Sequence, residues 1–215
     1  MCWPVDTVRI TSVDARYGPG VQPDRSTSLS TPRLAIRPLS LADLEAFVAY
    51  RQDPGVAHYQ GWDPSFTMSD GRALVLSQPD EPLPPPGGWL QLALLGKDGA
   101  LVGDVAVHTM EDGPNSFEIG VTLAPSHQGM GLAREAVEAV IEHLVTAAGA
   151  ERIVAVCDAR NEPVARLLQH VGLRKVSSEV DAEFFKGEWI TLDTYALATS
   201  DTRACLLYTS PSPRD

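Results

Sequence analysis

The sequence predicts an α/β fold with one mixed, mostly antiparallel sheet and helices on both of its faces. Residues 89–95, 101–108 and 117–123 are apolar β runs joined by short turns, as in consecutive antiparallel strands. An amphipathic helical run over residues 132–145 follows, and then a buried strand over 152–157. A strand–helix–strand unit makes a right-handed crossover and leaves its strands parallel, so this unit turns an antiparallel sheet into a mixed one.

The chain divides into three parts. Residues 1–30 are rich in Pro, Gly, Ser, Thr and Asp and lack a hydrophobic period, which predicts a flexible extension. A single domain is expected over residues 31–200, a length that suits one sizeable core. Residues 201–215 have nothing obvious to pair with, and we expect them to be a disordered or non-native tail.

The other elements are placed by caps and breakers. Residues 33–38 predict a short strand, 41–51 a helix with one buried face, and about 69–78 a second helix. The Pro-rich residues 79–88 are expected along the surface. After the strand at 152–157, Asn161 caps a helix that ends at Gly172, and the strands 173–176 and 188–196 complete the sheet.

Composition excludes several classes of function. The net charge of −11 argues against a nucleic-acid or anionic-membrane partner and favours a cationic acceptor. The three cysteines, Cys2, Cys157 and Cys205, have no paired spacing, so neither a disulfide framework nor a metal site is expected. No apolar run approaches the ~20 residues needed to span a membrane. We expect a cytoplasmic monomer or homodimer.

The glycine-rich loop from Gln128 to Ala133 carries the strongest functional signal. It follows a strand and opens a helix, so its N–H groups and the positive end of the helix dipole suit a phosphate. A P-loop is excluded because Leu132 and Ala133 stand where that motif needs Lys and Ser or Thr. A dinucleotide fingerprint lacks its third glycine, because position 134 is Arg. The residues alone leave a pyrophosphate cradle and a tight, ligand-free turn equally open.

The same loop resembles a known family. Gln128-Gly129-x-Gly131-x-Ala133, with Glu118-Ile119-Gly120 before it and Glu135-Ala136 after it, is similar to the GCN5-related N-acetyltransferases (GNAT), and among them to the ribosomal-protein N-terminal acetyltransferases. The resemblance runs from about Arg33 to Leu197. It implies acetyl-CoA as cosubstrate, bound by its pyrophosphate, and a splay between the two central strands. It also implies direct transfer of the acetyl group to an amine acceptor, which is a peptide N-terminus or a small molecule.

The resemblance also assigns site residues. Those implied to contact the cofactor are Ile119, Val121 and Leu123 through their main chain, Gln128, Gly129, Met130, Gly131, Leu132 and Ala133 in the loop, and Asn161. Asn161 is equally a plain helix cap, and the two roles are compatible. His58, Tyr59 and Trp62 lie where the family binds its acceptor, although aromatic packing of a loop explains them as well.

Glu118 is the candidate base or amine-orienting residue. It alternates with apolar Phe117 and Ile119, so it faces the other side of the sheet, where a carboxylate needs solvent or a partner. Function is one explanation, and a structural partner such as Arg37 is the other. Asp104 and His108, on the neighbouring strand, are further candidates for the same role. Leu168 stands where many relatives have a tyrosine acid, so another group such as Tyr195 serves, or the thiolate leaves without one. An aminoglycoside-like drug acetyltransferase and a catalytically inactive CoA-binding sensor are the alternative readings.

Overall fold

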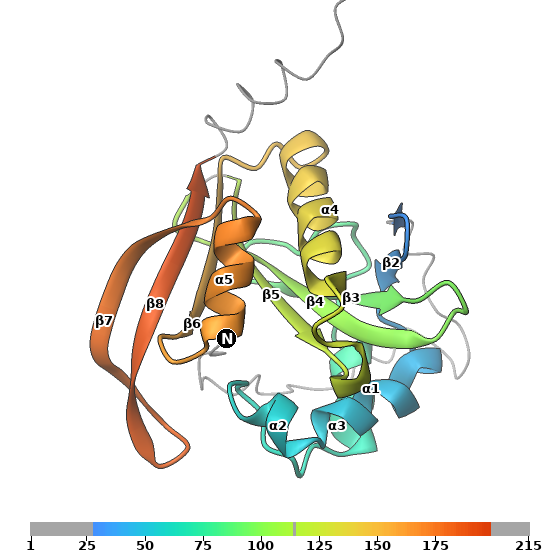
Figure 1. Ribbon diagram of the computed structural model, residues 1–215. Coiled ribbons are helices and arrows are strands. Elements are labelled where there is room, and N and C mark those ends of the chain that lie inside the picture. The colour runs from blue at the N-terminus through green and yellow to red at the C-terminus, as the bar shows by residue number, and fades with distance from the viewer. Residues whose placement is uncertain (1–27, 114, 199–215) are drawn as a thin grey trace, which may run out of the picture.

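The computed structural model of the chain describes residues 28–113 and 115–198. They form one eight-stranded sheet in the order β1-β2-β3-β4-β5-β6-β8-β7 (Figure 1). Its strands are β1 (Leu29–Ser30), β2 (Ala35–Pro38), β3 (Trp89–Leu95), β4 (Leu101–Thr109), β5 (Ser116–Leu123), β6 (Arg152–Asp158), β7 (Arg174–Phe185) and β8 (Glu188–Ala198). Neighbouring strands are antiparallel except β5 and β6, which are parallel. The predicted mixed, mostly antiparallel sheet is confirmed.

Helices cover both faces of this sheet. They are η1 (Leu41–Asp43), α1 (Leu44–Arg51), α2 (Pro54–Ala57), α3 (Met68–Leu76), η2 (Pro125–His127), α4 (Leu132–Thr146) and α5 (Glu162–His170). The core around α4 and α5 contains the odd-numbered side chains of β5, such as Ile119 and Val121. The even-numbered side chains belong to the opposite face, where Asp104 of β4, paired with Thr122, contacts Tyr50 of α1.

Helix α4 forms where the apolar period predicts it. The residues Ala136, Val137, Val140, Ile141, Leu144 and Val145 are buried against the sheet. Such a stripe at i, i+3, i+4 and i+7 stabilises a helix through tertiary packing. The helix ends shortly before Gly149, whose φ of +66° suits glycine. This packing fixes the start of α4 relative to the end of β5.

The two parallel strands stay together over a short distance. Ser116, Phe117 and Glu118 of β5 pair with Arg152, Ile153 and Val154 of β6. Beyond Glu118 the strands diverge, and Figure 1 shows β5 and β6 separating beside α5. The expected splay between two central strands is therefore confirmed.

Several element boundaries differ from expectation. Strand β7 runs over Arg174–Phe185, far beyond the expected 173–176. Among the described residues it is an edge strand that pairs with β8 alone, and it is exposed along most of its length, so its sequence lacks the apolar pattern of a buried strand. Leu29–Ser30 form an edge strand before the expected domain start. Most of the predicted extension and the tail at 201–215 lie outside the described residues, so the division of the chain stays a prediction.

Candidate active site

A cleft of about 630 Å³ opens at the splay. Its walls come from the segment after α1, the end of β5, the glycine-rich loop and the start of α5. The residues that line it include Tyr59, Val121, Gly129, Gly131, Ala133 and Asn161. The structure thus brings residues far apart in sequence, and predicted separately, to one cavity.

The glycine-rich loop presents a row of unused donors to this cleft. Gly129 and Gly131 have φ values of +72° and +76°, a conformation that residues with a Cβ rarely adopt. In the described part of the chain, the main-chain amides of Gly129 through Arg134 donate to no acceptor. The amide of Gln128 differs, because it donates to the carbonyl of Pro125 at 3.3 Å. The available run is therefore 129–134 rather than the expected 128–133.

These donors fit the diphosphate of coenzyme A. No side chain caps the helix at Gly131, so the first turn of α4 keeps both its free N–H groups and its positive dipole end. A Cβ built at Gly129 would meet nothing within 4 Å, so open space adjoins the loop at this position. An anion with several oxygens is the ligand that a helix start of this kind binds.

The loop residues contribute unequally through their side chains. Gln128 donates from Nε2 to the carbonyl of Leu123 at 3.0 Å and so ties the loop to the end of β5. Met130 is 58% exposed, whereas Leu132 is buried in the core under α4. Because its side chain is buried, Leu132 can contact a ligand through its main chain.

The end of β5 turns main-chain groups toward the splay. At either end of the β4–β5 ladder, the amide of Ala124 donates to Val102 and that of Met110 donates to Ser116. Since hydrogen-bonded and non-bonded pairs alternate in an antiparallel ladder, the even-numbered residues of β5 bond to β4. Ile119, Val121 and Leu123 therefore direct their N–H and C=O groups away from β4, toward the gap.

Asn161 lies across the cleft from the loop. Its Oδ1 accepts a hydrogen bond from the amide of Val164 at 3.4 Å, which makes it the N-cap of α5. The residue is buried and lines the cleft. Because the cap uses only Oδ1, the amide nitrogen is left for a second contact.

Glu118 lies at the last paired position before the splay, on the face opposite α4. Its structural partner is not Arg37, which pairs with Asp43 at 2.7 Å. Instead, Glu118 Oε2 lies 3.5 Å from Nδ1 of His108, the residue directly opposite on β4. This Nδ1 is buried and has no hydrogen-bond partner among the described residues, and the His108 ring stacks on Trp89 with 4.4 Å between ring centroids. The pair places a carboxylate and an imidazole where the two strands part.

The three predicted acceptor residues lie in the segment after α1 but differ in position. Tyr59 lines the cleft. The exposed His58 ring packs edge-on against the Tyr59 ring, with 4.4 Å between the ring centroids. Trp62 packs on the guanidinium of Arg51 at 3.7 Å and donates from Nε1 to the Arg51 carbonyl. Lys186, in the turn between β7 and β8, donates to the carbonyls of Ala57 and Trp62 and so joins this segment to the hairpin.

A buried charged cluster beneath this segment was missed by the sequence reasoning. Asp104 accepts hydrogen bonds from the Tyr50 hydroxyl and from Arg51 Nη2. Burial raises the pKa of Asp104, and the charge of Arg51 opposes that shift. Burial and the nearby Asp104 charge raise the pKa of Tyr50 well above its usual value. The sequence signals were Asp104, named as a further candidate base, and the position of Arg51 on the apolar face of α1.

Two further features of the described residues concern metal ions and membranes. Within residues 28–113 and 115–198, no group of three His, Cys, Asp or Glu side chains is arranged to hold a metal ion. No helix in that part of the chain is long and apolar enough to cross a membrane.

The chain is similar in sequence to known acetyltransferases. Residues 33–174 match the family described as Acetyltransferase (GNAT) domain. An uncharacterized N-acetyltransferase, p20, from Bacillus licheniformis is 27% identical over 170 residues, which cover 79% of this chain and 95% of that protein. A ribosomal-protein-serine acetyltransferase from Escherichia coli is 26% identical over 109 residues, which cover 51% of this chain and 61% of that protein.

A solved structure supports the fold independently. The structure of spermidine N-acetyltransferase from Vibrio cholerae, in complex with CoA and spermine, matches with a TM-score of 0.68 at 17% identity. The match covers 79% of this chain and 98% of that one. At this level of identity the likeness establishes the shared fold.

Proposed function

The chain belongs to the GNAT acetyltransferase family, and from that premise we propose that it transfers an acetyl group directly from acetyl-CoA to a primary amine. The family makes it an acetyl-CoA-dependent N-acyltransferase. The acceptor we propose is the N-terminal amino group of a protein or a small amine. The single observation that carries the proposal is the row of free amides from Gly129 to Arg134 at the mouth of the cleft.

The splay supplies the second half of the binding site. Main-chain groups of Ile119, Val121 and Leu123 face the gap that β6 leaves open. A pantetheine chain carries amides of its own, so it can pair with this strand as a neighbouring strand would. Asn161 closes the site from the other side with its free amide nitrogen.

Bound acetyl-CoA supplies an activated acyl group as a thioester. The protein must hold the acceptor amine beside it and take a proton from that amine, because only the neutral form is a nucleophile. Glu118 is the residue we assign to this proton, directly or through one water molecule. When the C–N bond has formed, the nitrogen gives up its second proton to solvent, the C–S bond breaks and the sulfur leaves as a thiolate.

The leaving group needs no acid from the protein. Leu168 is buried in the core, and Tyr195 is also buried, where burial raises the pKa of its phenol. A thiol has a pKa of about 8.5, so a thiolate is a stable leaving group near neutral pH and takes its proton from water. This argument weakens the inactive-sensor reading that the absence of the family tyrosine suggested.

The acceptor class is argued from charge and from relatives. A net charge of −11 attracts cationic molecules, which both N-terminal peptides and polyamines are. One relative is named for a ribosomal-protein serine and a structural neighbour for spermidine. The same charge also favours an aminoglycoside, which is the second candidate acceptor.

The first experiment separates these possibilities. We expect coenzyme A to raise the melting temperature in a saturable manner, and a melting curve unmoved by millimolar acetyl-CoA would reject the proposed cradle. Thiol release from acetyl-CoA should then be measured with a panel of N-terminal peptides, polyamines and aminoglycosides. Cofactor binding without thiol release for any amine would favour a sensor over an enzyme.

The second experiment tests Glu118. Glu118→Gln should lower turnover about 100-fold, the lower end of what a general base contributes, while the affinity for acetyl-CoA stays within twofold. Equal turnover in the variant and the parent would remove Glu118 from the mechanism. His108→Gln is the informative companion, because it changes the neighbour of Glu118 without removing the carboxylate.

A further inference from the structure

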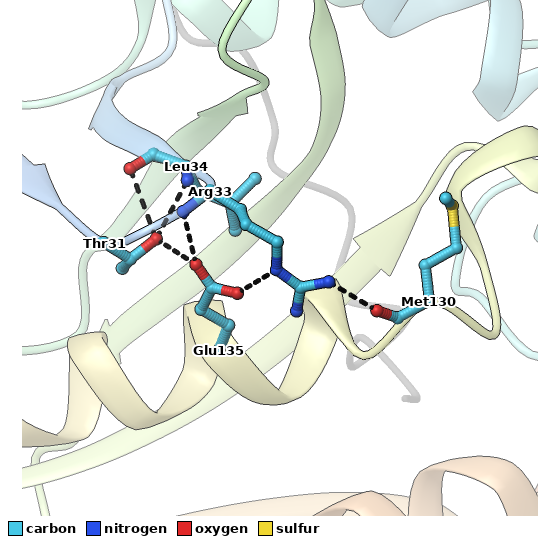
Figure 2. Close-up of polar contacts among 5 residues, drawn as sticks. All are labelled: Thr31, Arg33, Leu34, Met130 and Glu135. Atoms are coloured by element: carbon cyan, nitrogen blue, oxygen red, sulfur yellow. Dashed lines mark hydrogen bonds and ion pairs between the residues drawn. The ribbon is translucent and has the colours of Figure 1, made fainter.

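Arg33, at the start of the domain, reaches the glycine-rich loop almost 100 residues later in the sequence. Its Nη1 donates to the carbonyl of Met130 at 2.8 Å, and its Nε donates to Glu135 Oε2 at 2.5 Å (Figure 2). The other carboxylate oxygen of Glu135 accepts from the amide of Arg33 at 2.8 Å and from the hydroxyl of Thr31. One guanidinium therefore bridges the segment before β2, the first turn of α4 and the loop itself.

The contact with Met130 decides which way the next amide points. All described peptide bonds are trans, and in a planar trans peptide the C=O and N–H groups point in opposite directions. With the Met130 carbonyl directed at Arg33, the N–H of Gly131 must point away from Arg33. Gly131 lines the cleft, so the side of this peptide that carries the donor is the side available to a ligand.

Glycine makes this orientation optional rather than obligatory. Both Gly129 and Gly131 have positive φ, and glycine populates positive and negative φ about equally. The Met130–Gly131 peptide can therefore rotate and bring its carbonyl toward the cleft, where it would repel an anion. A contact from outside the loop is needed to select one orientation.

Glu135 holds Arg33 in place for this task. Although burial favours the protonated form, hydrogen bonds from Thr31 and Arg33 outweigh it and lower the pKa of Glu135. The carboxylate also offsets the charge of Arg33, so the guanidinium acts on the loop chiefly through geometry. Thr31 and the amide of Arg33 fix the other edge of the carboxylate.

We infer that Arg33, held by Glu135, is a positioning residue that keeps the Met130 carbonyl out of the cleft and the Gly131 amide directed at the diphosphate of coenzyme A. This inference rests on the proposed function, because it needs the cradle to bind that diphosphate. It assigns no proton transfer to Arg33. It makes the first residues of the domain part of the cofactor site.

The test compares two arginines with similar surroundings. Arg33→Met removes the contact with Met130, and Arg152→Met is its matched control, because Arg152 is similarly exposed and pairs with Asp112 at 3.3 Å. Calorimetry should show that Arg33→Met weakens the affinity for coenzyme A about tenfold, roughly one charge-assisted hydrogen bond, while Arg152→Met stays within twofold of the parent. The affinity for pantetheine, which lacks the diphosphate, should be the same in all three proteins.

Two further measurements separate positioning from simple destabilisation. At saturating coenzyme A, amide hydrogen exchange in a peptide covering residues 128–135 should be slowed less in Arg33→Met than in the parent, and exchange in peptides from β7 and β8 should be the same in both. In steady-state assays the KM for acetyl-CoA should rise about tenfold while kcat is retained. Glu135→Gln should shift both readouts in the same direction by a smaller factor.

The outcomes distinguish the two proposals. If the parent does not bind coenzyme A, the proposed function fails and this inference fails with it. If the parent binds and Arg33→Met binds equally well, the inference alone is overturned. A uniform loss of affinity for coenzyme A and pantetheine, together with faster exchange throughout the protein, would likewise overturn it in favour of a structural role.

Discussion

Helices α4 and α5 begin at the same cleft after the two diverging strands, yet their first turns are built in opposite ways. At the start of α5, the Asn161 side chain accepts from the amide of Val164, and Pro163 has no N–H to satisfy. At the start of α4, Gly131 provides no side-chain cap, and the loop and first-turn amides stay free.

The difference separates stability from binding. A capped helix start satisfies its donors within the chain and gains about 1 kcal/mol from doing so. An open start leaves those donors to water or to a ligand, so it gives up that stability and gains an anion site. Substitutions at α5 should therefore act mainly on folding, and substitutions at α4 mainly on cofactor affinity.

The largest effect on the affinity for coenzyme A should come from Gly131→Val. A β-branched residue at a φ of +76° carries a strain of roughly 2 kcal/mol, and relieving it moves the loop, so the affinity for coenzyme A should fall about 30-fold. Isothermal titration calorimetry measures this directly. Gly149→Val is the control, because Gly149 has a similar φ at the other end of α4 and open space around it.

The control should lose stability without losing affinity. If Gly149→Val weakened coenzyme A binding as much as Gly131→Val does, the effect would be general strain in α4 rather than damage to the cradle. Unchanged affinity in Gly131→Val would identify the loop as a merely structural turn.

The next largest effects are expected at Asn161, which both caps α5 and lines the cleft, so its substitution can change stability and cofactor affinity. Asn161→Ala removes the cap and should lower the free energy of unfolding by about 1 kcal/mol, or the melting temperature by about 3 °C. Asn161→Asp keeps an acceptor for Val164 but replaces the amide donor with a negative charge. It should therefore preserve stability and weaken coenzyme A binding about fivefold, the loss of one neutral hydrogen bond. Full affinity in Asn161→Asp would restrict Asn161 to capping.

Lowering the pH should have a smaller effect on stability, through Glu135 in the first turn of α4. The pKa of Glu135 is lowered in the folded protein, so its contribution to stability is present above its unfolded pKa of about 4.3 and is lost as pH falls through the folded value. Glu135→Gln should therefore lose less stability than the parent between pH 6 and pH 3. Urea unfolding at both pH values measures the difference, and identical losses would contradict a lowered pKa.

The smallest effect is expected at Met130. Its side chain is exposed while its carbonyl makes the contact with Arg33. Met130→Ala keeps the main chain and should leave the affinity for coenzyme A within twofold. A tenfold loss would show that the loop binds through this side chain, and the contrast between main-chain and side-chain recognition would have to be abandoned.

Local patterns were sufficient to predict the framework of the site. The period of α4, the glycine spacing before it and the cap at Asn161 are all short-range signals, and the structure has the predicted helix, loop and cap. The roles of the site residues stay predictions, because no ligand contact tests them. The structure adds that part of this set lines one cleft, namely Tyr59, Val121, Leu123, Gln128, Gly129, Gly131, Ala133 and Asn161.

The contacts that the sequence could not reveal join distant positions. Arg33 and Met130 are 97 residues apart, and the sequence contains no local pattern that links them. The enclosure of Arg51 by Trp62, Phe66 and Asp104 is likewise tertiary, since a helical period marks a position as buried without naming its partners. The length of β7 was missed because Ser177 to Asp181 are exposed, so no hydrophobic alternation marks them as a strand.

The brief pairing of β5 with β6 has a mechanical consequence. Three bridged positions on each strand fasten the half of the sheet that carries Glu118 and the open amides to the half that carries Asn161. The angle between β5 and β6 at these three positions therefore sets the distance between the groups on the two halves that are proposed to contact coenzyme A. A residue such as Ile153, buried at the bridged position opposite Phe117, can thereby alter the spacing of the whole site although it has no assigned catalytic or cofactor role.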